Sequence, residues 1–398
     1  TGGTAGTGGT GGTGGTGGTG GTGGTGSPTC LEGDNPPCWG PAVSFDAVVA
    51  EPDRLALADF DADGDVDVCV AGETVACWRN DGFGDLGLGP HYESYDDVLD
   101  VTAASLDSVP SGDLAVLHDG GDRVQWIFNV LAGDTGNNTT MGTAIELAAL
   151  DVDGDDHHEA VLAITQGALV VPILNDLTLP TPQAPFPVLA NGGEPHHLTT
   201  GTFTTATGPG EFAYAAGQQV HVYREAQGAG GGGGAGAAPP YELARTYSDA
   251  GQNIGAIAAY RKAGEPVDWL VVAWACPTCN DAEIIEFWNA SNQSEQRLRL
   301  SSQGPFNPIG IAVGHFLGPG EETDGLALIS GDAASTDRVV IFSHYGDPSM
   351  PTLSLPTGGR APSAVAAGDL NGDDYDDVIV ALPGSPNQLS VFLSNPDS

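Results

Sequence analysis

Positive charge and long apolar runs are both scarce in this chain. Its 398 residues include 11 Lys and Arg against 52 Asp and Glu, which gives a formal net charge of −41 at pH 7. So few cations cannot neutralise a phosphate backbone, and this excludes a general nucleic-acid binder. No stretch approaches the roughly 18 consecutive apolar residues that a transmembrane helix requires. We therefore expect neither a nucleic-acid partner nor a membrane span.

Cysteine is also scarce, and it occurs in close pairs. The three pairs are Cys30 with Cys38, Cys69 with Cys77, and Cys276 with Cys279. An even number in close pairs predicts disulfides formed in an oxidising compartment. Cys69 and Cys77 fall on consecutive predicted strands, where a disulfide would staple one hairpin. The CxxC at 276–279 lacks both a βαβ context and further zinc ligands, so we interpret it as a structural disulfide.

The N-terminal segment is almost entirely Gly and Thr. Residues 1–26 repeat Thr-Gly-Gly with a period of three, and a Gly-rich segment cannot build a core. Two interpretations stay open: a flexible spacer, or a polyproline-II-type helix that presents Thr along one edge to sugars or to a partner. We assign 1–40 to this tail and its linker. The chain begins at Thr1 without an apolar leader, from which we expect a processed form.

Three acidic loops carry the strongest chemical signal. Residues 59–67, 151–159 and 369–377 each place oxygen-bearing side chains on alternate residues of a Gly-containing turn. Such oxygens suit a hard cation such as Ca²⁺. An EF-hand is excluded, because loop position 12 is apolar in all three (Val70, Leu162 and Val380) and a strand-like run follows each loop. We therefore expect each metal to lie at the turn of a β-hairpin.

The same strand pattern recurs along residues 41–398. Third strands that end in an aromatic residue, often with Asn, fall at 77–80, 126–129, 172–175, 221–224, 286–289, 340–343 and 391–395. Four of these units lack the carboxylates at loop positions 1, 3 and 5. Repeats of roughly 50 residues with several short strands are typical of propeller blades. The sequence thus predicts an all-β, seven-bladed β-propeller, with residues 43–49 supplying the missing outer strand of the last blade.

These loops, together with the motif Trp-x-Asn-Asp-Gly-Phe-Gly at 78–84, resemble the FG-GAP/VCBS repeat. That repeat forms the calcium-binding propeller of integrin α subunits and of many bacterial surface proteins. The resemblance covers about 42–395 and is specific in the first, third and seventh units. It implies three Ca²⁺ sites, each with four side-chain ligands and one backbone carbonyl. The implied ligands are Asp59, Asp61, Asp63, Asp67 and the Asp65 carbonyl; Asp151, Asp153, Asp155, Glu159 and the His157 carbonyl; and Asp369, Asn371, Asp373, Asp377 and the Tyr375 carbonyl.

We expect an extracellular or cell-surface interaction protein with a calcium-stabilised propeller. Its partner would be a protein or a glycan, and self-association through 1–26 would build filaments if the contact does not close. No nucleophile elbow, phosphate-binding loop or HExxH motif occurs, so we expect no catalytic residues. Two alternatives stay open: a lectin-like propeller and a polysaccharide-active enzyme. We assign no ligand role to His196-His197.

Overall fold

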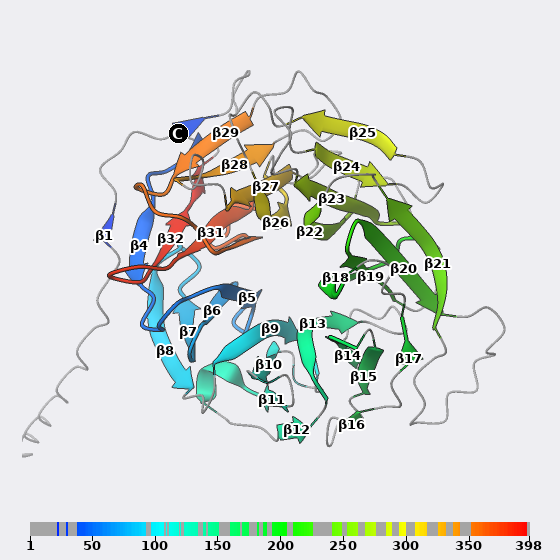
Figure 1. Ribbon diagram of the computed structural model, residues 1–398. Helices are drawn as coiled ribbons and strands as arrows, with labels where there is room; N and C mark the ends of the chain where they lie inside the picture. Colours follow the sequence, from blue (N-terminus) through cyan, green and yellow to red (C-terminus); the bar gives the residue numbers. More distant parts are fainter. Residues whose placement is uncertain are drawn as a thin grey trace, which may run out of the picture.

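The computed structural model describes residues 22–23, 29–30 and most of 38–395. Within 38–395 the undescribed residues are 93–96, 107–108, 110, 119, 121–122, 134–137, 141, 151–159, 168, 175–180, 183–185, 189–192, 205–209, 226–240, 249–252, 262–266, 276–283, 289–293, 300–306, 317–324, 332–336 and 343–351. Almost every element in the described part is a β-strand (Figure 1), and the one helix is the 3₁₀ turn η1 (Val130–Ala132). Among these residues, no helix is long and apolar enough to cross a membrane.

Six sheets are each built from strands that follow one another in the chain, and we call these blades. In chain order their strands are β5 (Arg54–Ala58), β6 (Asp67–Ala71), β7 (Val75–Asn80) and β8 (Leu86–Tyr92); β9 (Val98–Ala104), β10 (Asp113–His118), β11 (Arg123–Ile127) and β12 (Asn138–Thr140); β13 (Ala144–Leu150), β14 (Ala160–Thr165), β15 (Leu169–Leu174), β16 (Thr181–Pro182) and β17 (Phe186–Pro187); β18 (Pro195–Gly201), β19 (Glu211–Ala216), β20 (Gln219–Glu225) and β21 (Tyr241–Ser248); β22 (Asn253–Tyr260), β23 (Trp269–Ala275), β24 (Ile284–Trp288) and β25 (Ser294–Arg299); and β26 (Pro308–Gly314), β27 (Gly325–Ser330), β28 (Arg338–Phe342) and β29 (Thr352–Pro356). In each blade the first strand of the group lies innermost, and neighbouring innermost strands contact one another (Figure 1).

A different sheet closes the ring. It runs in the order β1 (Thr22–Gly23), β4 (Val43–Asp46), β32 (Gln388–Phe392), β31 (Asp377–Leu382), β30 (Ala364–Gly368), and so joins the two ends of the chain. Strand β4 pairs antiparallel with β32, as expected for the N-terminal segment, and β30 contacts β5 to complete the circle. A small sheet of β2 (Thr29–Cys30), β3 (Cys38–Trp39) and β33 (Ser394–Asn395) adjoins it in sequence.

The prediction of a seven-bladed propeller is therefore wrong. The structure has six blades of consecutive strands, and the last repeat unit does not form a blade from its own strands. That unit contributes only β30 to β32, and its outer edge would leave backbone N–H and C=O groups unpaired. Strands β4 and β1 cover this edge and make a five-stranded closing sheet. A count of third-strand endings in the sequence does not distinguish a blade built from consecutive strands from a sheet that combines strands from both ends of the chain.

Hydrophobic clusters fill the space between neighbouring sheets. One cluster joins the first blade to the closing sheet, and others join successive blades. Middle strands such as β10, β19 and β31 are buried along their whole length, because a neighbouring sheet packs on each face. This is why they read as short continuous apolar runs. Trp39 is fully buried against Phe316, with ring centroids 6.2 Å apart, and it anchors the N-terminal segment between the sixth blade and the closing sheet.

One disulfide pins the first blade. Cys69 on β6 and Cys77 on β7 are register partners, and their sulfur atoms are 2.06 Å apart. Cys38 is buried and disulfide-bonded, and it is the register partner of Cys30 across β2 and β3. Cys276 and Cys279 lie outside the described residues.

Candidate metal centre

The first acidic loop connects β5 to β6 as a tight turn. Two of its residues have positive φ, Ala62 at 61° and Gly64 at 98°. The Asp59 carboxylate accepts hydrogen bonds from the backbone N–H groups of Asp63 (3.2 Å) and Gly64 (2.9 Å). The loop therefore wraps round the carboxylate at its first position, as short Asp side chains favour in turns.

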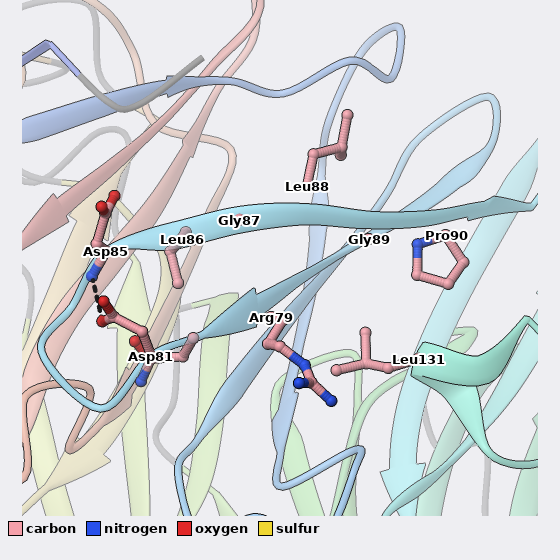
Figure 2. A pocket seen from close by; sticks show the side chains of 10 residues that line it. Arg79, Asp81, Asp85, Leu86, Gly87, Leu88, Gly89, Pro90 and Leu131 are labelled. Carbon is pink, nitrogen blue, oxygen red and sulfur yellow. Dashed lines mark hydrogen bonds between the residues drawn. The ribbon is translucent and has the colours of Figure 1, made fainter. Parts of the chain in front are cut away.

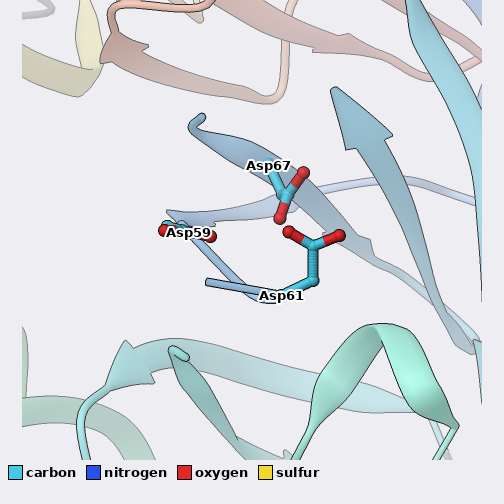
Figure 3. Close-up of side chains that lie close together, drawn as sticks. All are labelled: Asp59, Asp61 and Asp67. Atoms are coloured by element: carbon cyan, nitrogen blue, oxygen red, sulfur yellow. The ribbon is translucent and has the colours of Figure 1, made fainter. Parts of the chain in front are cut away.

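Three carboxylates of this loop converge on one point (Figure 3). Asp59, Asp61 and Asp67 each offer an oxygen, and these oxygens lie within 4.8 Å of one another. Asp63 is exposed and accepts a hydrogen bond from the Asp65 N–H at 3.1 Å, and it does not belong to this group. The structure thus brings together three of the four predicted side-chain ligands.

The Asp61 carboxylate indicates that a cation fits this loop. Both of its oxygens are buried, and neither accepts a hydrogen bond from the described residues. Its one recorded partner there is the guanidinium of Arg79, with which it forms an ion pair. Arg79 contacts Oδ2, which leaves the buried Oδ1 without a donor among the described residues, and a carboxylate oxygen of this kind matches the ligand preference of Ca²⁺. Arg79 supplies part of the positive charge that this cluster requires.

If Asp59 is counted as loop position 1, the acid at position 9 is Asp67, which is fully buried and holds the hairpin together. Asp67 accepts hydrogen bonds from the N–H of Phe60 at 2.8 Å and from the N–H of Asn80 at 2.9 Å. It therefore ties the loop to the end of β7. Burial raises the pKa of Asp67 to about 6, against the lowering effect of these two hydrogen bonds.

The seventh-unit loop between β30 and β31 repeats this construction. Asp369 accepts hydrogen bonds from the N–H groups of Gly372 (2.7 Å) and Asp374 (2.9 Å). Asp377 accepts them from Leu370 at 2.8 Å and Ser394 at 2.5 Å, and burial raises the pKa of Asp377 to about 7. Asn80, at the end of β7, and Ser394, two residues after β32, are thus equivalent donors, and the residues before them, Arg79 and Leu393, occupy equivalent positions.

Side chains of this seventh loop also bond to one another. The Asn371 amide donates to Asp373 Oδ2 at 3.0 Å and to the Ser394 carbonyl at 2.9 Å. The Tyr375 N–H donates to Asp373 Oδ1 at 3.0 Å. The implied ligands of this loop are therefore adjacent. The third loop, with Asp151, Asp153, Asp155, His157 and Glu159, lies outside the described residues.

Sequence reasoning missed that the acid at position 9 persists in units without the other loop carboxylates. Asp113 in the second unit accepts the Leu106 N–H at 2.8 Å, and Glu211 in the fourth accepts the Thr204 N–H at 2.6 Å. In both cases the donor lies seven residues earlier in the chain, as Phe60 does for Asp67. The signal was an acid nine or ten residues after the last residue of the first strand. The same backbone hydrogen bond thus recurs in units whose loops lack the set of carboxylates found at positions 1, 3 and 5 of the acidic loops.

A second acid links neighbouring sheets. The carboxylate of Asp376 accepts the N–H of His315 at 2.7 Å, while its own N–H donates to the His315 carbonyl at 3.1 Å. Asp268 forms the same pair of bonds with Thr202, at 2.7 and 2.8 Å. Each of these acids stands at the start of a second strand and reaches the end of the innermost strand of the preceding blade. These paired bonds thus tie the turn before each second strand to the neighbouring sheet.

Comparisons with known proteins agree with this architecture. Residues 361–392, which contain β30, the seventh loop, β31 and β32, match the FG-GAP repeat. No curated protein sequence matches the chain. The fold is similar to chains of two crystal structures of BBS1N in complex with ARL6DN, one soaked with mercury and the other with lead. In both, the TM-score is 0.63 with 11% sequence identity, and the match covers 90% of this chain and 98% of the other. This likeness identifies a β-propeller fold, and the sequence match to the FG-GAP repeat is confined to residues 361–392.

Proposed function

We propose that the protein is an extracellular or cell-surface interaction protein built on a calcium-stabilised propeller. The observation that carries the calcium part is the convergence of Asp59, Asp61 and Asp67, in which the buried Oδ1 of Asp61 accepts no hydrogen bond from the described residues. The FG-GAP match over 361–392 supports an equivalent site in the seventh loop. A disulfide in the first blade supports an oxidising compartment.

The calcium ion would be structural. In the first unit the ligands would be the side chains of Asp59, Asp61, Asp63 and Asp67 with the Asp65 carbonyl, as the resemblance implies. Carboxylates held this close repel one another, and a divalent cation offsets that repulsion. A calcium ion would hold the turn between β5 and β6. Because Asp67 at the end of this turn accepts the N–H of Asn80 at the end of β7, calcium would also stiffen the pairing of β6 with β7. The same reasoning applies to the seventh loop and, by sequence, to the third.

The tail supports self-association by strand addition. Strand β1, Thr22–Gly23, belongs to the Thr-Gly-Gly segment and pairs antiparallel with β4, the outer strand of the closing sheet. A Thr-Gly-Gly backbone therefore already serves as an outer strand on this ring. The same repeat in another copy could add to an exposed sheet edge through backbone hydrogen bonds. We propose this contact as the basis of assembly.

The outer edge of the first blade offers a protein-binding surface (Figure 2). A cavity of about 510 Å³ lies along β8, where Gly87 and Gly89 leave room beside Leu131, and Arg79 and Asp85 supply charge. Leu88 on the same strand is 52% exposed. The similar protein BBS1N is itself solved in complex with ARL6DN. A protein partner is thus the kind of ligand that this surface fits best.

A sedimentation experiment tests the interaction proposal. We expect the full chain to form larger species at rising concentration, and a variant lacking residues 1–26 to remain monomeric. A synthetic Thr-Gly-Gly peptide should compete with assembly, while a scrambled Ser-Gly peptide of equal length serves as control. Identical sedimentation of the full chain and the truncated variant would refute self-association through the tail.

The two alternatives receive less support. A lectin-like propeller would expose Trp or Tyr between blades, but the exposed large hydrophobic side chains of the described residues include neither. An enzyme acting on uronic-acid polymers would need carboxylates outside the calcium loops. Such groups line a cavity where the innermost strands meet, and there Asp53 and Asp100 outnumber Arg54 and would repel a polyanion.

A further inference from the structure

A cavity of about 460 Å³ opens where the innermost strands meet at one end of the central channel. One wall is polar and comes from the first four blades: Asp53, Arg54, Asp100, Glu146, His196 and His197. The opposite wall is mainly apolar and comes from the fifth and sixth blades and the closing sheet: Ala256, Ile257, Ile309, Ile311 and Val365. This volume falls in the range of small-molecule sites, which combine apolar walls with a few polar groups.

A ring of β-bulges shapes this mouth. The register shifts by one residue in β9, β13, β18, β22 and β26, which leaves Leu99, Ile145, His197, Gly255 and Ile309 without a register partner. The residue directly after each bulge lines the cavity: Asp100, Glu146, Leu198, Ala256 and Gly310. His197 adopts a positive φ of 53°, which is strained for a side chain of this size. Bulges re-aim side chains and are frequent beside functional sites, so their repetition here marks a built cavity.

The polar wall carries more negative than positive groups. Arg54 Nε lies 3.4 Å from Asp100 Oδ1, and Arg54 Nη1 lies 3.3 Å from Asp53 Oδ2. Asp100 is 8% exposed, and its Oδ2 accepts the Leu147 N–H at 2.7 Å. One guanidinium thus faces three carboxyl groups, the third being Glu146. The wall lacks a second positive charge.

Near pH 7 the ionised carboxylate that a bound cation would meet is Asp100, because Glu146 is still protonated there. Burial, and after it the nearby Asp100, raises the pKa of Glu146 to about 8. Burial lowers the pKa of His197 to about 3, so this imidazole is neutral near pH 7 and cannot supply the missing charge. Among the described residues, the group of metal-type side chains close enough to share one ion lies in the first acidic loop and not here. An organic cation therefore fits the channel mouth better than a metal ion.

We propose that the channel mouth binds a small organic ammonium ion with an aliphatic body. The ammonium group would lie against the ionised carboxylate of Asp100 and donate a hydrogen bond to the neutral carboxyl of Glu146, and its chain would lie against Ile257, Ile309 and Val365. This site is separate from the calcium loops and from the tail, so it goes beyond the interaction function proposed above.

The test uses hexylammonium as probe, with hexanoate and hexanol as charge-reversed and neutral controls. Binding to the full calcium-loaded chain is followed by saturation-transfer NMR and calorimetry at about pH 7. We expect saturable binding of hexylammonium, at least tenfold tighter than either control, since one charge pair in a partly buried site contributes about that factor. Asp100→Asn should weaken hexylammonium at least fivefold.

A second variant, which places a positive charge in the cavity, keeps the test valid even if Asp100→Asn fails to fold. Ile309→Lys places an amine on the apolar wall at a side chain that is 40% exposed, and it should abolish hexylammonium binding. Leu243→Lys on β21, at a side chain that is 41% exposed, is the matched control and should bind as the parent does. Equal or tighter binding of hexanoate, absence of saturation by hexylammonium, or unchanged binding to Ile309→Lys would each overturn the proposal.

Discussion

Single buried carboxylates explain how the turns of this ring hold their shape. Asp67 and Asp377 lie in loops with metal-type oxygens, whereas Asp113 and Glu211 make the same backbone bond in units that lack them. A buried N–H left without its acceptor costs about 1–3 kcal/mol, which is enough to retain one acid after the others are lost. The hydrogen bond to the backbone is therefore a sufficient reason for the acid to be present, even in a loop that binds no metal.

Asp113→Ala tests bracing without metal. Removing the acceptor for the Leu106 N–H should lower the free energy of unfolding by about 1–3 kcal/mol and leave calcium affinity unchanged. Urea denaturation with and without chelator measures both effects. Asp46→Ala, which removes an exposed Asp that accepts the Val48 N–H, is the control and should change stability by less than about 0.5 kcal/mol. A loss that disappears in chelator would contradict a metal-independent role.

Arg79 distinguishes the first loop from the seventh. Its guanidinium pairs with Asp61, while the equivalent residue of the seventh unit is Leu393. Because a nearby positive charge opposes a cation, Arg79→Leu should raise calcium affinity of the first loop severalfold. Calorimetric titration of the variant checks this, with Arg224→Leu at the exposed pair with Glu242 as control. Weaker calcium binding in Arg79→Leu would show that Arg79 instead helps to shape the site.

Glu146 should make stability fall as the pH rises. The folded protein retains the Glu146 proton to about pH 8, whereas the unfolded chain releases it near the ordinary value of 4.5, so unfolding releases a proton between these values. The slope is at most about 1.4 kcal/mol per pH unit. The raised pKa of Asp100, about 6, acts in the same direction, and the lowered pKa of His197, about 3, acts in the opposite direction below about pH 6.5. Glu146→Gln should therefore gain stability relative to the parent between about pH 5 and pH 8 in urea denaturation, and parallel curves would refute this.

At the scale of elements, the first hairpin of the first blade combines two constraints. The loop at 59–67 sits at one end of β6, and the Cys69–Cys77 disulfide links β6 to β7. The disulfide closes a loop with a sequence separation of 8 residues. A closed loop of that length stabilises the folded state by about 2–3 kcal/mol in the chain-entropy account. The two constraints act on the same pair of strands.

Replacing both cysteines tests this. The double variant Cys69→Ala, Cys77→Ala should unfold at lower denaturant concentration, with a loss of about 2–3 kcal/mol. Adding a reductant should destabilise the parent more than the double variant. Chemical denaturation with and without reductant measures the difference, and an equal response of both proteins would show that the bridge does not stabilise the hairpin.

Element-level prediction from sequence succeeded where local pattern alone decides the outcome. Short apolar runs at 68–70 and 378–382 predicted buried strands, and alternate oxygens predicted the acidic turns between strands. The bulges could not be predicted, because a bulge depends on the pairing register between two strands, which the sequence of one strand does not show. For this reason His196 and His197 were given no role, although the bulge in β18 places both at the channel mouth.

At the scale of the whole molecule, closure comes from the two ends of the chain. The all-β ring and the use of residues 43–46 as an added strand could be predicted, since an open sheet edge needs a partner. The predicted number of blades was wrong: six sheets are built from consecutive strands, and the last repeat unit shares a five-stranded closing sheet with β4 and β1. The cross-sheet bonds of Asp268 and Asp376 were also missed, since they join residues that lie 66 and 61 positions apart.

The central claim is that calcium stabilises this ring through its acidic turns. The most direct measurement is thermal unfolding of chelator-stripped protein, with and without added Ca²⁺, alongside a calorimetric titration. We predict that calcium binds and raises Tm, that Mg²⁺ at equal concentration raises it less, and that Asp59→Asn with Asp369→Asn removes most of the shift. No heat of binding together with an identical Tm in calcium and chelator would contradict the account.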